Sequence, residues 1–66
     1  MGTFRFHMIG AHQPIELDVA VLSIGELNEV LTRQRFLEGR LTQPDGDGVL
    51  VAMLVATSRI QCVVES

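Results

Sequence analysis

The chain has 66 residues, of which 47% are hydrophobic, and its formal net charge at pH 7 is −3. Domains of this size bury little core and usually rely on disulfides, metals or self-association. A single cysteine excludes an intrachain disulfide, no zinc-type spacing of Cys and His occurs, and the acidic balance argues against a general nucleic-acid binder. We therefore expect residues 1–66 to form one small domain that assembles with itself.

The apolar segments are too short for a membrane protein. None reaches the roughly 18–20 residues that span a bilayer, and the first ten residues lack the apolar segment of a secretory signal. An unpaired thiol suits a reducing compartment. The expected location is the cytoplasm, with no membrane partner.

Two strands are predicted at the start of the chain. Apolar and polar residues alternate along residues 3–9 and again along residues 15–21, which is typical of half-buried strands. Residues 10–14 between them have the composition of a turn. Matching the apolar faces predicts a hairpin with these opposed pairs: Met8 and Ile15, His7 and Glu16, Arg5 and Asp18.

A helix is predicted next. Ser23 followed three residues later by Glu26 forms a capping box, in which each side chain accepts a backbone N–H at the helix start. The apolar residues that follow recur at helical spacing: Ile24, Leu27, Val30 and Leu31. We expect a helix over 24–34, and a helix this short must pack on the sheet to be stable.

The rest of the chain is predicted to be extended. Residues 36–42 alternate and contain Gly39, which indicates a bulge, a bend or a close backbone approach. Residues 43–48 form a loop, and residues 59–65 form a last strand. That strand is expected to point three residues inward: Ile60, Cys62 and Val64. Cys62 is accordingly expected to be a buried, inert thiol.

These elements define an α+β fold. Their order is β-β-α-β-β-β, and short connections between the last strands favour antiparallel pairing. We expect a five-stranded antiparallel sheet, either open or curled into a small barrel, with one helix packed on it.

Residues 49–56 read VLVAMLVA and are apolar on both faces when extended. A strand of this kind is expected at the centre of a sheet, covered on two sides. The helix covers one side, so the other requires barrel closure or a second copy of the chain. The predicted interface of a homo-oligomer therefore consists of Val49, Leu50, Val51, Met53, Leu54 and Val55.

No residue pattern predicts an enzyme or a cofactor. The nearest approach to a metal cluster is a set of four residues that we interpret as a surface hairpin: His7, His12, Glu16 and Asp18. Residues 45–48 lack the further oxygen ligands of a calcium loop and read as a turn. A Cys62–His7 nucleophile pair would require the first and last strands to be neighbours, and no third group would orient it.

Two functions are compatible with these patterns. The favoured one is a non-enzymatic module that assembles with itself and with another protein. The alternative is a binder of nucleic acid or a small ligand, in a cleft between subunits lined by Arg35, Phe36 and Arg40. Stacking of bases needs exposed aromatic side chains, and Phe36 is the only aromatic residue predicted on an outer face.

Overall fold

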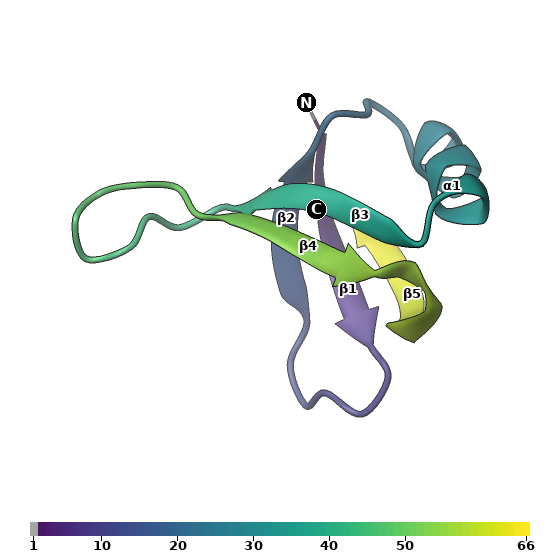
Figure 1. The fold of residues 1–66 in the computed structure, drawn as a ribbon, viewed down its shortest axis with the longest axis horizontal. Coiled ribbons are helices and arrows are strands. Elements are labelled where there is room, and N and C mark those ends of the chain that lie inside the picture. The colour runs from purple at the N-terminus through teal and green to yellow at the C-terminus, as the bar shows by residue number, and fades with distance from the viewer. Residues whose placement is uncertain (1) are drawn as a thin grey trace.

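The computed structural model describes residues 2–66 and contains five strands, one α-helix and one short 3-10 helix (Figure 1). In chain order these are β1 (Gly2–Met8), β2 (Ile15–Val19), α1 (Ile24–Arg33), β3 (Phe36–Leu41), β4 (Ala52–Ala56), η1 (Thr57–Arg59) and β5 (Ile60–Glu65). The predicted order of strands and helix is confirmed. No helix among these residues is long and apolar enough to cross a lipid bilayer.

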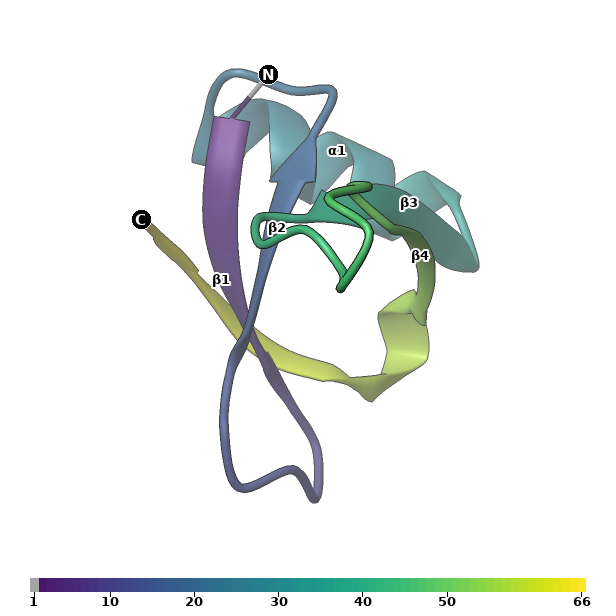
Figure 2. The same cartoon turned by 90° about the vertical axis from the view of Figure 1, so that its left-hand side faces the viewer.

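All five strands form one antiparallel sheet in the order β4-β3-β2-β1-β5. The predicted α+β class is therefore confirmed. The sheet curves but does not close into a barrel, because β4 and β5 are its two edges and are joined through η1 (Figure 2). After β4, at one edge of the sheet, the chain crosses to the opposite edge, where β5 pairs with β1. The order of the strands in the sheet therefore differs from their order in the chain.

The β1–β2 hairpin has a different register from the predicted one. Phe6, not Met8, lies opposite Ile15, and Arg5 lies opposite Glu16, not Asp18. The shift is two residues, so each side chain keeps its predicted face. The connection is therefore longer than predicted, and His7 and Met8 pair only with β5, on the other side of β1.

A β-bulge separates the two ends of the β1–β5 pairing. His7 lies opposite Cys62, whereas Met8 lies opposite Ile60, so Gln61 is the extra residue. The bulge reverses the alternation of β5: Ile60 and Val63 pack against the core, and Cys62 is exposed. The predictions that Cys62 is buried and that Val64 points inward are therefore wrong, because they assumed unbroken alternation along this strand; Val64 is 45% exposed.

Helix α1 begins and ends as its sequence predicts. Ser23 is the N-cap, and its Oγ accepts a hydrogen bond from the backbone N–H of Glu26 at 3.2 Å. The Glu26 carboxylate accepts from the N–H of Leu22 at 3.4 Å, one residue before the N–H that a standard capping box would satisfy. At the other end, the N–H of Gln34 donates to the carbonyl of Val30 at 3.0 Å.

The core lies on the concave face of the sheet, where α1 packs toward one end (Figure 1). Leu27 is the one helix residue that is buried, at 1% exposure, and Val30 and Leu31 pack beside it. The fully or nearly buried side chains are Phe4, Phe6, Leu17, Val19, Leu27, Leu37 and Val55. The predicted packing of the helix on the sheet is thus achieved mainly through one leucine.

Gly39 on β3 marks a close backbone approach, one of the three predicted alternatives. A Cβ atom at this position would lie 3.1 Å from Val19 Cγ1 and 3.2 Å from both the Asp18 carbonyl oxygen and Leu17 Cβ. One of these neighbours is backbone and another is the first carbon of a side chain, so neither can rotate away. Glycine is the residue that lets β2 and β3 pack here without displacement.

Gly39→Ala is expected to lower the free energy of unfolding by about 1–3 kcal/mol, because the added methyl overpacks a filled site. Gly46→Ala is the control. It has no atom within 4 Å of the new Cβ and does not have a positive φ, so its effect should stay within about 0.5 kcal/mol. Urea denaturation of both variants measures the difference. Equal midpoints would show that the approach at Gly39 is not tight.

Residues 49–56 do not form the predicted central strand. β4 begins at Ala52 and is an edge strand, paired with β3 alone. Residues 42–51 instead form an arm that projects from the body of the molecule (Figure 1). The prediction fails because β5 pairs with β1, which leaves no strand to cover the second edge of β4.

Candidate interaction surface

Strand β4 divides its side chains between the core and solvent. Met53 packs against the core and Val55 is buried in it, at 3% exposure. Leu54 points the other way and is 66% exposed. The small residues Ala52 and Ala56 flank it on the same face. Of the predicted interface residues on this strand, Leu54 is thus the one that a second molecule could contact freely.

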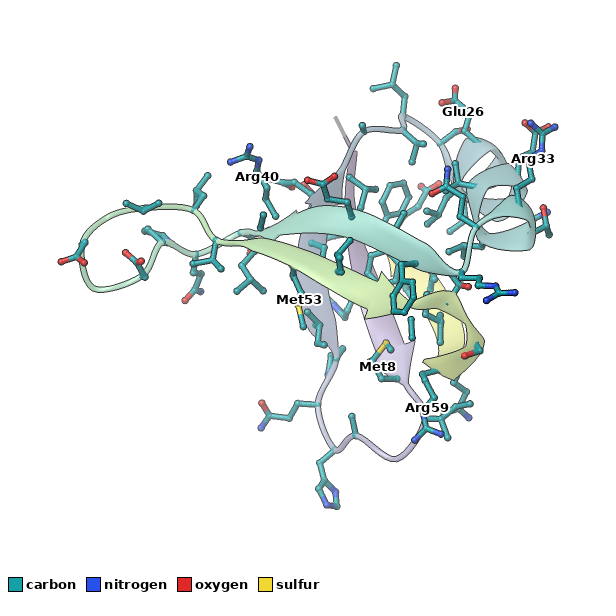
Figure 3. The ribbon with its side chains drawn as sticks, in the orientation of Figure 1. Met8, Glu26, Arg33, Arg40, Met53 and Arg59 are labelled. Carbon is teal, nitrogen blue, oxygen red and sulfur yellow. The ribbon has the colours of Figure 1, made fainter. Side chains whose placement is uncertain are left out.

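The neighbouring strand β3 extends this outer face. Phe36 lies opposite Ala56 and is 55% exposed, so its predicted outward position is confirmed. Glu38 lies opposite Leu54, and Arg40 lies opposite Ala52. Figure 3 shows Arg40 on the side of the β3–β4 ribbon opposite to Met53. The result is an apolar pair, Phe36 and Leu54, within a surface of small and charged residues.

Arg35 lies just before β3, where it lines a pocket together with Phe36, Ala56 and Thr57. Its backbone carbonyl accepts hydrogen bonds from the N–H and the Oγ1 of Thr57, at 2.8 and 3.0 Å. These bonds fasten the start of η1 to the start of β3. The three residues predicted for the alternative ligand site are exposed; Arg35 and Phe36 line the same pocket, which Arg40, further along β3, does not border.

The arm is a hairpin held by backbone bonds and by one aspartate. The N–H of Leu41 donates to the carbonyl of Val51, and the N–H of Asp45 donates to that of Val49, both at 2.9 Å. Asp45 Oδ1 accepts from the N–H of Asp47 at 2.8 Å and of Val49 at 3.0 Å. The predicted turn at residues 45–48 is thus confirmed. The Asp45 carboxylate accepts the hydrogen bonds that order its backbone.

The arm carries the first part of the apolar run into solvent. Val49 is 58% exposed, and Leu50 and Val51 are also exposed. We call the exposed apolar residues of β3, β4 and the arm the β4 patch; they are Phe36, Val49, Leu50, Val51 and Leu54. Apolar groups concentrated on one edge of a small molecule mark a site of interaction.

The outer face of the other strands is mainly polar, with Val64 of β5 as an exposed apolar residue. Thr3 Oγ1 donates a hydrogen bond to Asp18 Oδ1, and Asp18 lies opposite Arg40 on β3. His7 of β1 and Cys62 of β5 are opposed in the register, so the first and last strands are indeed neighbours. No side-chain hydrogen bond described within residues 2–66 orients either group.

The four residues considered for a metal do not come together. His12 lies in the exposed β1–β2 loop, whereas His7 is half-buried on β1. Within the part of the chain that the structure describes, there is no group of three or more His, Cys, Asp or Glu side chains that could hold a metal ion. The side chains of β1 and β2 instead form cross-strand contacts, such as that of Thr3 with Asp18.

Sequence reasoning missed Phe36 as a member of the apolar surface, although it placed this residue on an outer face. The missing information was the β3–β4 register, which sets Phe36 diagonally next to Leu54. Comparison of the chain with models of protein families, with curated proteins and with solved structures gave no match. The surface itself must therefore carry any proposal about function.

Proposed function

We propose that this chain is a non-enzymatic, self-associating interaction module and that it assembles through the β4 patch. The observation that carries the proposal is the uncharged free edge of β4, beside which Leu54 is 66% exposed. Free edges normally carry charges, prolines or bulges that prevent pairing with another chain. Residues 49–56 contain no charged residue and no proline, and no bulge interrupts the β3–β4 register.

Size supports the same conclusion. A domain of 66 residues buries only about 60% of its unfolded surface and gains stability when more apolar surface is covered. The features of the β4 patch are apolar side chains and free backbone groups, which suit the binding of another chain better than acid–base chemistry. An exposed, unpaired thiol at Cys62 supports a location in the reducing cytoplasm.

Molar mass in solution, measured by light scattering over a range of concentrations, tests the proposal. The unmodified protein is expected to reach a multiple of its chain mass of 7.3 kDa. Leu54→Asp is expected to remain folded, because the side chain is exposed, and to have the mass of a single chain. A charge buried in an apolar interface without a partner costs several kcal/mol, so dissociation should be complete at micromolar concentration.

Leu22→Asp is the matched control. Leu22 is 76% exposed and lies in the β2–α1 connection, away from β4. This variant should keep the mass of the unmodified protein. A single-chain mass for the unmodified protein at all concentrations would contradict the proposal, as would equal masses for the two variants. Absorbance at 260 nm across the same peak would reveal carried nucleic acid, the outcome that favours the alternative site at Arg35, Phe36 and Arg40.

A further inference from the structure

The free edge of β4 presents its backbone groups at alternate residues. The carbonyl of Val51 accepts from β3 and the N–H of Thr57 donates to Arg35, at 2.9 and 2.8 Å. In an antiparallel ladder, residues of the same parity direct their groups to the same side. Residues 51, 53, 55 and 57 therefore face β3. The N–H and C=O groups of Ala52, Leu54 and Ala56 face away from it and are free for another strand.

The two edges of the sheet differ in how they are protected. Strand β5 contains the Gln61 bulge, and it ends at Glu65, an exposed charged residue placed opposite Phe4. Bulges and charged side chains are features that hinder pairing of an edge with another chain. Strand β4 has neither. A head-to-tail assembly that joins β4 to β5 of the next copy would need both edges, so pairing of β4 with β4 is favoured.

Opposite charges lie at the two ends of the β4 edge. The arm tip contains Asp45 and Asp47 and no basic residue. At the other end, Arg33 and Arg35 border a shallow pocket that has no acidic residue in its lining, and Arg59 ends η1 close by. Figure 3 shows Arg33 and Arg59 at the end of the molecule away from the arm. Two copies in antiparallel orientation would therefore bring the acidic tip of each to the basic end of the other.

On these grounds we propose that two copies of the chain pair antiparallel through β4, about a two-fold axis at Leu54, to form a continuous ten-stranded sheet. This inference rests on the proposed self-association and specifies its partner and geometry. Leu54 lies opposite Leu54 of the second copy, and Ala52 lies opposite the second copy's Ala56. These pairs exchange about six backbone hydrogen bonds.

The charges beside the axis are compatible with this pairing. The two copies of Glu38 are three strand spacings apart, about 14 Å, which exceeds the screening length of about 8–10 Å at ordinary ionic strength. Arg40 at the base of the arm lies opposite Asp18 within its own chain. The arm of each copy passes the second copy's Ala56 and approaches its Arg35 and Arg59.

Cysteine cross-linking tests the register in a Cys62→Ser background. Paired residues that exchange hydrogen bonds have Cα atoms about 5.5 Å apart, within the roughly 4.4–6.8 Å that a disulfide spans. Leu54→Cys should therefore give a disulfide-linked dimer on oxidation. Ala52→Cys should not, because its two copies are offset by four residues, about 14 Å. Linkage at position 52 and not at 54 would overturn the proposed axis.

Charge reversal tests the orientation. One variant reverses the arm tip by Asp45→Asn and Asp47→Lys. Asparagine at position 45 retains the side-chain oxygen that orders the turn. The other variant carries Arg35→Glu and Arg59→Glu, whose side chains are exposed. At low salt each variant alone should dimerise roughly tenfold more weakly or worse, whereas an equimolar mixture should form a heterodimer and regain the affinity.

The outcomes separate the two proposals. If Leu54→Asp dissociates the protein but charge reversal and mixing leave the affinity unchanged, self-association stands and the antiparallel β4 pairing is wrong. A mass above that of a dimer at saturation, which indicates a ring or a filament, also overturns the pairing. If the unmodified protein stays a single chain, the proposed function itself is wrong.

Discussion

Phe6→Ala is expected to leave the chain largely unfolded at room temperature. Phe6 has 0% exposure and lies on β1, between Ile15 of β2 and Val63 of β5. Truncation of a buried phenylalanine costs about 3–5 kcal/mol, because it removes apolar contacts and leaves a cavity. A chain of this length has a total stability of only about 3–10 kcal/mol. The truncation therefore removes most of the free energy of unfolding of the domain.

Circular dichroism during heating measures this effect, and Phe36→Ala is the matched control. The same change at Phe36, which is 55% exposed, should shift the melting temperature by no more than a few degrees when measured on the dissociated Leu54→Asp background. That background removes the contribution of assembly from both variants. Similar melting temperatures for the two alanine variants would mean that Phe6 of β1 does not contribute to the core as its burial indicates.

Leu27→Ala is expected to detach the helix and lower the free energy of unfolding by about 2–5 kcal/mol. Leu27 is the single buried residue of α1, at 1% exposure, and joins the helix to the core of the sheet. Alanine has the highest helix propensity, so the loss reports packing and not the intrinsic preference of the chain. A helix of ten residues is not stable in water without such packing.

Ellipticity at 222 nm in increasing urea measures the effect, with Asn28→Ala as the control. Asn28 is the exposed neighbour of Leu27 on the same helix. Its replacement by alanine raises helix propensity without touching the core, so the midpoint should stay the same or rise slightly. A Leu27→Ala protein that unfolds at the same urea concentration as the Asn28→Ala protein would show that α1 does not depend on this contact.

Local features of the fold were predictable because local chemistry decides them. The bounds of α1 follow from the Ser23 cap and from the apolar spacing that includes Leu27, and both lie within a few residues of one another in the chain. The faces of β1 and β2 follow from strict alternation. Of the three alternatives predicted for Gly39, the close backbone approach is the one found, since an interior strand position without a side chain usually has a packing reason.

Strand order and register were not predictable in the same way. An apolar run such as residues 49–56 indicates that both faces tolerate apolar contacts, but not which strands lie beside it. Its position at an edge depends on β5 crossing to β1, a choice between distant partners that no local pattern encodes. The Gln61 bulge likewise depends on the partner strand, and it decides that Cys62 faces outward.

The sequence predicted which segment carries the candidate surface, but not how the residues of that surface are arranged. Sequence reasoning selected the six larger residues among the eight apolar residues of the run, and the structure turns Leu54 and residues 49–51 outward while Val55 enters the core. The neighbour Phe36 and the opposed acidic and basic ends of the edge required the β3–β4 register and the projection of the arm. These are properties of two strands together.

Pairing of β1 with β5 has a consequence for the synthesis of the protein. Phe4 and Glu65 are opposed in the sheet, so one of the closing contacts joins residues separated by nearly the whole chain. Folds dominated by such distant pairings fold slowly, on the order of milliseconds to seconds. On the ribosome, β1 can pair with β2 early, but its other side stays bare until residues 60–65 leave the exit tunnel. The nascent chain therefore passes through a stage in which β1 has a free edge that β5 covers in the finished fold.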